Sequence, residues 1–294
     1  DDGWMHPGQV TVTAEVVRRL VEDQFPEWSD LPVATVASAG TVNALFRIGD
    51  ALVARFPLAA EYADADREVR AAREILGRIG FSTPVPVAVG APGAGYPFPW
   101  SVHTWLPGTV AFDADPGDSV AFAHDLAVLI QDIRAIDVRG RTHRGGRGGD
   151  LRSHDDGVDA ALRRSTELLD IDRLRSLWHD LRDLPRTGPV DVMCHGDLTP
   201  GNVLVTDGRL SGVIDWGTLG PADPALDVVC AWHLLDPGPR QALRDALGCD
   251  DVEWERGKAW AFVQSVSLVW YYVETNPTMA ALGRRTLERI TVAT

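Results

Sequence analysis

Three side chains that offer oxygen ligands lie close together in the second half of the chain. Asp197 and Asn202 stand at opposite ends of a Pro-Gly loop, and Asp215 follows soon after. The apolar segments 203–205 and 210–214 are predicted to pair, because the Asp-Gly between them is typical of a hairpin turn. This hairpin would fold Asp215 back toward the loop. Two carboxylates and an amide oxygen, without Cys or His at zinc spacing, favour a hard cation such as Mg²⁺.

The spacing of these residues matches two kinase motifs. His195, Asp197 and Asn202 give the pattern H-x-D-x-x-x-x-N, and residues 215–217 give D-x-G. Either Asp197 or Asn202 alone could simply cap a turn, but two motifs in this order are much more specific. The run resembles the aminoglycoside phosphotransferase family of antibiotic and small-molecule kinases, which includes the macrolide phosphotransferases.

This resemblance implies a role for each motif residue. Asp197 would orient and deprotonate an acceptor hydroxyl, and Asn202 and Asp215 would hold Mg²⁺. The phosphate donor would be ATP or GTP. His195 and Asp227 are expected to support the site structurally, Asp227 from a segment that matches the family's D-P-x-L-D. The long activation segment of protein kinases, which ends in A-P-E, does not follow residue 217. A small-molecule kinase is therefore predicted.

The resemblance covers nearly the whole chain and predicts an α+β, two-lobed, protein-kinase-like fold. We expect a nucleotide-binding lobe with a small antiparallel β-sheet over residues 1–100 and a hinge over 101–108. A mostly helical lobe with the catalytic loop and the acceptor site would span 109–294. Hydrophobic periodicity predicts helices at 13–25, 64–79, 119–136, 158–169, 174–184 and 252–274, and strands at 33–37, 44–48, 51–57 and 100–108.

A loop and an arginine of the first lobe are candidates for holding phosphate. Ser38, Gly40 and Thr41 lie in a small-residue turn between two strands, where backbone amides can approach a phosphate closely. Where kinases carry a lysine on the third strand, this chain has Arg55, which keeps the charge and offers a two-pronged donor. The single lysine of the chain, Lys258, lies far away in the second lobe.

A helix glutamate and a hinge complete the predicted nucleotide site. The resemblance implies that Glu68 pairs with the arginine, and Glu74 is the alternative. The backbone around Ser101 and His103 would contact the nucleotide base. Segment 140–149, rich in Gly, Arg and His, is interpreted as a mobile surface loop, and closure over a substrate is the alternative.

The composition of the chain indicates which classes of binding partner are expected. With 42 acidic and 28 basic residues, the net charge of −14 argues against nucleic acid and favours a cationic acceptor. Glu274 and Asp251 are candidate acceptor-binding acids. Apolar runs fall short of the roughly 18 residues that cross a bilayer, so no membrane partner is expected. Cys194, Cys230 and Cys249, an odd number without metal spacing, indicate free thiols in the cytoplasm.

Three functions agree with these observations. The first is a kinase that phosphorylates an antibiotic, an aminoglycoside or a macrolide, and so confers resistance. The second is a kinase for a metabolite such as a sugar or an amino alcohol. The third, which rests only on Arg55 in place of the usual lysine, is a nucleotide-binding protein without catalysis.

Overall fold

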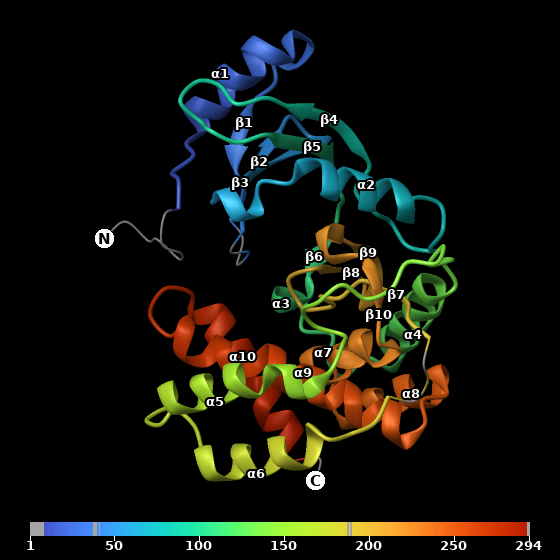
Figure 1. Cartoon of the computed structure of the whole chain (residues 1–294). Coiled ribbons are helices and arrows are strands. Elements are labelled where there is room, and N and C mark those ends of the chain that lie inside the picture. The colour runs from blue at the N-terminus through green and yellow to red at the C-terminus, as the bar shows by residue number, and fades with distance from the viewer. Residues whose placement is uncertain (1–8, 38–39, 41, 187, 189, 293–294) are drawn as a thin grey trace.

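The computed structural model describes residues 9–37, 40, 42–186, 188 and 190–292. A β-sheet with two helices forms one end of the molecule, and helices dominate the other end (Figure 1). The predicted α+β arrangement, a small antiparallel sheet joined to a mostly helical part, is confirmed. The residues at which one lobe gives way to the next, 1–100, 101–108 and 109–294, stay a prediction.

Within the described residues, five antiparallel strands form the sheet in the order β1-β2-β3-β5-β4. These strands are β1 (Val33–Thr35), β2 (Asn43–Ile48), β3 (Leu52–Pro57), β4 (Pro86–Gly90) and β5 (Trp100–Thr104). Successive side chains along each strand point to opposite faces of the sheet. On one face Phe56 stacks on Trp100 with ring centroids 4.8 Å apart, beneath α1 (Ala14–Gln24). Val53 and Arg55 point to the opposite face, which lines a pocket.

Helix α2 (Ala65–Ile75) connects the sheet region to the catalytic segment. It begins after Asp64, whose side chain accepts a hydrogen bond from the Arg67 backbone at 2.9 Å. The helix ends four residues earlier than predicted, because the chain leaves the helical conformation at Leu76 and turns at Gly77 with φ +71°. Its other contacts include the 3₁₀ turn Trp216–Thr218, directly after Asp215. One helix therefore touches both parts of the predicted site.

The remaining helices pack around a single large core (Figure 1). They are α3 (Ala111–Ala114), α4 (Val120–Arg134), α5 (Asp155–Arg164), α6 (Ile171–Leu181), α7 (Cys230–Leu234), α8 (Pro237–Leu247), α9 (Asp251–Tyr271) and α10 (Pro277–Val292). Helices α5 and α6 each begin three residues before the predicted position, and α9 ends three residues before it. Among the helices described, none combines the length and hydrophobicity needed to cross a bilayer.

The predicted hairpin is present at the centre of the molecule. Strands β8 (Val203–Thr206) and β9 (Arg209–Val213) pair through Thr206 and Arg209, and β6 (Thr109–Val110) adds to β8. Both turn residues, Asp207 and Gly208, have positive φ, as a two-residue hairpin turn of this kind requires. A second pair joins β7 (Val192–Cys194) to β10 (Gly220–Ala222).

The hairpin is also joined to the chain that leaves α2. The Val213 backbone N–H donates to the carbonyl of Ser82 at 3.0 Å, and Ser82 forms a bridge with Gly212. Contacts of this kind fix the position of Asp215 relative to the sheet.

Candidate active site

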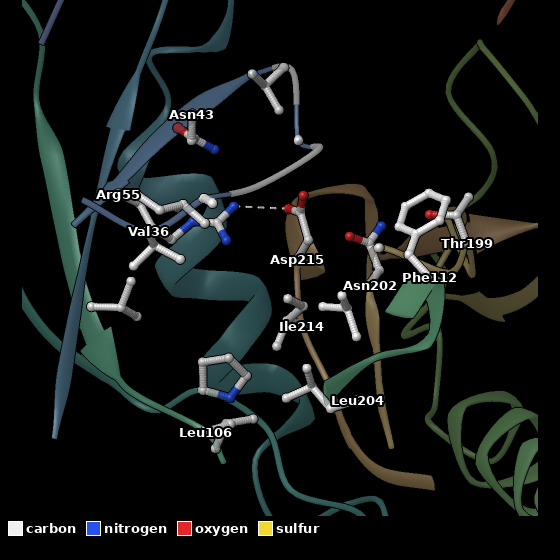
Figure 2. A pocket seen from close by; sticks show the side chains of 18 of the residues that line it. Val36, Asn43, Arg55, Leu106, Phe112, Thr199, Asn202, Leu204, Ile214 and Asp215 are labelled. Atoms are coloured by element: carbon white, nitrogen blue, oxygen red, sulfur yellow. Dashed lines mark hydrogen bonds and ion pairs between the residues drawn. The ribbon is translucent and has the colours of Figure 1, made fainter. Parts of the chain in front are cut away.

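A pocket of about 920 Å³ lies between the sheet and the hairpin. This volume is large enough for a nucleotide beside a small acceptor. Figure 2 shows apolar side chains from both walls facing each other across one end of it. The labelled ones are Val36, Leu106, Leu204 and Ile214, and Val53 also lines the pocket. An apolar slot between two β-structures suits the flat faces of a nucleotide base.

The loop from Asp197 to Asn202 is tightened by its own hydrogen bonds. The Thr199 N–H donates to the Asp197 carbonyl at 2.9 Å, and the Asn202 N–H donates to the Thr199 carbonyl at 3.0 Å. The Asn202 side-chain amide donates to both the carbonyl and Oδ2 of Asp197, each at 2.9 Å. The carboxylate and the carboxamide that the sequence singled out are therefore in direct contact.

A fully buried carboxylate supports this loop from behind. Asp227 accepts the backbone N–H groups of His195 at 2.7 Å and Gly196 at 2.8 Å. Burial raises the pKa of Asp227, although the two backbone donors act in the opposite direction. Gly196 has φ +83°, and a Cβ there would lie 3.3 Å from the Thr218 carbonyl oxygen. A glycine is thus required at this turn.

His195 links the loop to the end of the hairpin. Its ring Nδ1 accepts the Asp197 backbone N–H at 3.2 Å. The Nε2 atom therefore carries the hydrogen and donates it to the Ile214 carbonyl at 3.1 Å. The ring is fully buried against Trp216. These contacts join the catalytic loop to the hairpin, and the supporting role of His195 stays a prediction.

Asp215 occupies a strained position at the hairpin's end. Its φ of +63° is left-handed, which costs a non-glycine residue about 1–2 kcal/mol and often marks a functional site. Figure 2 shows the Asn202 amide oxygen turned toward Asp215, with its nitrogen turned away. The described residues contain no cluster of three or more His, Cys, Asp or Glu that could hold a metal. Asn202 and Asp215 are oxygen donors of the kind Mg²⁺ takes, with phosphates and water as the remaining ligands.

Arg55 bridges the sheet, α2 and the hairpin. Its guanidinium donates to both oxygens of Glu68 at 3.0 Å. It also donates to Oδ1 of Asp215 at 3.0 Å (Figure 2). Burial alone would lower the pKa of Arg55, but the charges of Glu68 and Asp215 more than offset it, so the pKa is raised. Glu74, the alternative partner, binds Arg141 instead. Lys258 is buried in α9 and pairs with Glu255 at 3.2 Å.

Within the predicted hinge, the residues that line the pocket begin at His103 rather than at Ser101. Ser101 is buried in β5 and lies outside the pocket lining, where its hydroxyl contacts the His103 ring at 3.0 Å. His103 and the segment 104–106 line the pocket. Burial lowers the pKa of His103 to about 4, so its ring is neutral at pH 7. Gly40 also lines the pocket, whereas Ser38 and Thr41 lie outside the described residues.

Phe112, Asp113 and residues 275–279 also line the pocket. Neither predicted acid lines it. Glu274 is exposed just before the segment 275–279. The expectation for Asp251 is wrong: it pairs with Arg244 at the first turn of α9, and this 21-residue helix is about 30 Å long. Only the opposite end of α9 leads toward the pocket.

Sequence reasoning missed one charged contact at the site. Arg147, from the segment interpreted as a surface loop, places Nη1 3.1 Å from Oδ1 of Asp197. Its only signal in the sequence is an arginine between two pairs of glycines. No periodicity connects it with a residue fifty positions away.

Sequence comparison agrees with this geometry. The model of the phosphotransferase enzyme family matches residues 33–260. An aminoglycoside 3′-phosphotransferase of Salmonella typhimurium is 26% identical over 174 residues, 53% of this chain and 61% of the relative. One of Streptomyces fradiae is 40% identical over 125 residues, 36% of this chain and 47% of the relative. The chain thus spans about half to three fifths of the length of these curated relatives.

Solved structures share the fold. The GDP complex of wild-type aminoglycoside 2′-phosphotransferase-IIIa has a TM-score of 0.75 and 20% identity, covering 96% of this chain and 99% of that chain. The apoenzyme of a macrolide 2′-phosphotransferase from Brachybacterium faecium has a TM-score of 0.61 and 18% identity, with coverages of 92% and 97%. At these identities the likeness concerns the fold alone.

Proposed function

Because the chain belongs to the phosphotransferase enzyme family, we propose that it transfers the terminal phosphoryl group of ATP or GTP to a hydroxyl of a small molecule. An antibiotic, first of all an aminoglycoside, is the proposed acceptor. One observation carries the reaction type: Asp197, Asn202 and Asp215 meet in one pocket, opposite the Arg55–Glu68 pair.

Asp197 is the base in the proposed reaction. The acceptor hydroxyl oxygen forms a bond to the terminal phosphorus, and the bond from that phosphorus to the bridging oxygen breaks, releasing ADP or GDP. The hydroxyl proton moves to the Asp197 carboxylate. Asn202 orients this carboxylate through Oδ2, so the base is held in place before the acceptor arrives. Positioning and charge neutralisation then supply most of the catalysis.

Asn202 and Asp215 would hold Mg²⁺, which neutralises negative charge on the donor phosphates when bound. Arg55 adds a fixed positive charge beside them. Glu68 holds this guanidinium by two hydrogen bonds and Asp215 by one, so it faces the position where the phosphates would lie. Apolar side chains of both walls would sandwich the base, with the backbone of 104–106 at its edge.

Two findings support an antibiotic as the acceptor. The curated relatives are aminoglycoside 3′-phosphotransferases. Proteins of the same fold have been solved with kanamycin, gentamicin and streptomycin. The chain's net charge of −14 also suits a cationic drug. Its three free cysteines suit the cytoplasm, where ATP and GTP are abundant.

A coupled nucleotide-turnover screen tests the proposal. Wild type and Asp197→Ala would receive ATP or GTP with Mg²⁺ and a panel of aminoglycosides, macrolides and common metabolite alcohols. We expect turnover with an aminoglycoside, lowered roughly a hundred- to ten-thousandfold in Asp197→Ala, whose nucleotide affinity should be unchanged. Calorimetric titration with ADP would check the affinity.

The other outcomes separate the remaining functions. Turnover only with a sugar or an amino alcohol would indicate a metabolite kinase. Tight nucleotide binding without turnover for any acceptor would favour a non-catalytic protein. Wild-type rates in Asp197→Ala would contradict the assigned base.

A further inference from the structure

The catalytic carboxylate lies beside a fixed positive charge. Asp197 accepts a hydrogen bond from Arg147 at Oδ1, over 3.1 Å, and one from the Asn202 amide at Oδ2, over 2.9 Å. Both of its oxygens therefore have a donor. The side chains of Arg147 and Asp197 are 34% and 30% exposed, which leaves room for an acceptor to approach. Among the described residues, Arg147 forms no ion pair other than this one.

The backbone around Arg147 is attached to the protein core, contrary to the expectation of a mobile surface loop. The Asp223 N–H donates to the Gly148 carbonyl at 2.9 Å. Arg256 donates to the Gly149 carbonyl at 3.3 Å, while its guanidinium pairs with the fully buried Asp223 carboxylate. Gly148 has φ +93°, and a Cβ there would lie 2.6 Å from Cβ of Ala222. The loop therefore presents Arg147 from a fixed base.

This geometry limits where the reacting hydroxyl can lie. A hydroxyl within hydrogen-bond distance of either Asp197 oxygen is at most roughly 6–8 Å from the Arg147 guanidinium. An ammonium group on the neighbouring carbon of the acceptor would face the guanidinium at a similar distance. The Asp197 carboxylate attracts such an ammonium, and the Arg147 guanidinium offsets this attraction. At this distance in a partly enclosed site, the repulsion from the guanidinium alone changes affinity about tenfold.

We infer that Arg147 is a specificity-determining residue that favours acceptors whose reacting hydroxyl is flanked by uncharged groups. This inference rests on the proposed function and refines its substrate class. Ammonium groups farther out on the acceptor are compatible with it, because the pocket lining includes the exposed Asp113. The one arginine among the described lining residues, Arg55, is paired with Glu68 and Asp215. The acceptor is then a cationic molecule in which the groups next to the reacting hydroxyl are uncharged, such as further hydroxyls.

Two kanamycins provide a matched pair of probes. We take the 3′-hydroxyl as the reacting group, because the curated relatives are aminoglycoside 3′-phosphotransferases. Next to this hydroxyl, kanamycin A carries a hydroxyl, whereas kanamycin B carries an ammonium group. We would measure kcat/KM for both with wild type, Arg147→Gln and Arg147→Lys. Arg144→Gln is the control, because Arg144 is an exposed arginine of the same loop and its loss changes the net charge equally. Thermal melting would verify that each variant is folded.

The expected result is a wild-type preference for kanamycin A that falls about tenfold in Arg147→Gln. Arg147→Lys and Arg144→Gln should keep the wild-type preference. An unchanged preference in folded, active Arg147→Gln would overturn the inference and leave the proposed function intact.

A second measurement does not depend on turnover. Calorimetric titration of the two kanamycins into the ADP-bound protein compares their affinities in wild type and in Arg147→Gln. Tighter binding of kanamycin A, lost in Arg147→Gln, supports the inference. Equal binding of both kanamycins by wild type overturns it. Absent turnover by the wild-type protein would count against the proposed function alone.

Discussion

Arg55 lies on the third strand, where protein kinases carry a lysine, and its contacts explain how the site accommodates an arginine. A guanidinium can donate to both oxygens of one carboxylate and to another acceptor at the same time, whereas an ammonium is a point charge. Arg55 uses this capacity by binding Glu68 in two hydrogen bonds and Asp215 in one. The substitution therefore gives no support to the non-catalytic alternative.

The two glutamates of α2 allow a matched test at this residue. Glu68→Gln should lower kcat/KM for the nucleotide roughly ten- to hundredfold, because Arg55 loses the carboxylate that orients it. Glu74→Gln removes a similar partner from Arg141, outside the pocket, and should leave kcat/KM near the wild-type value. Steady-state kinetics with varied nucleotide would measure both. Equal losses in the two variants would contradict the assigned role of Glu68.

At the scale of elements, the site depends on how loops are anchored to the core. The segment 140–149 looks like a solvated loop by composition, yet Gly148 and Gly149 are bound to the buried Asp223–Arg256 pair. Two glycines of this segment with similar backbone angles differ in their surroundings. Gly146 has φ +75°, and a Cβ added there would have no neighbour within 4 Å, whereas a Cβ on Gly148 would overlap Ala222.

We expect the alanine variants of these two glycines to differ. Gly146→Ala should cost about 1 kcal/mol through backbone strain alone. Gly148→Ala adds a steric overlap and should cost about 1–3 kcal/mol more. It should also reduce the kanamycin preference, because Arg147 would be displaced. Urea unfolding and the kanamycin assay measure the two effects. Similar stability losses in both variants would show that the loop is not anchored at Gly148.

Two buried histidines connect the stability of the whole molecule to pH. Burial lowers the pKa of His103 and of His233 from 6.5 to about 4. The unfolded chain therefore binds more protons than the folded chain between pH 4 and 6.5. The free energy of unfolding therefore has its full value above pH 6.5, as far as these two histidines are concerned. It decreases as the pH falls from 6.5 to 4, by up to about 3 kcal/mol for each histidine.

A substitution at His233 should reduce this pH dependence. The His233 ring is bound between Thr286 and Gln264, at 3.0 Å from each, in the helical core. His233→Gln should lose stability at pH 7.5 but show a shallower decline toward pH 4.5. His179→Gln, an exposed control on α6, should keep the wild-type slope. Urea unfolding at several pH values would test this, and parallel slopes for wild type and His233→Gln would contradict it.

The sequence by itself determined the features that depend on neighbouring residues. The Asp-Gly turn and the catalytic motifs each consist of residues close together in the chain, so both could be predicted from the sequence. The alternation in β3 likewise shows that Arg55 shares a face with Val53. The motif spacing carried the resemblance to a known family, and that resemblance predicted the fold class and the reaction type.

Only the tertiary structure decided which distant charges meet. The choice between Glu68 and Glu74 depends on how α2 is rotated against β3, and the distance of Asp251 from the pocket depends on the direction of α9. Arg147 reaches Asp197 because the core holds a glycine segment fifty residues earlier in the chain. Such pairings arise from packing between elements, and no local pattern in the sequence encodes them.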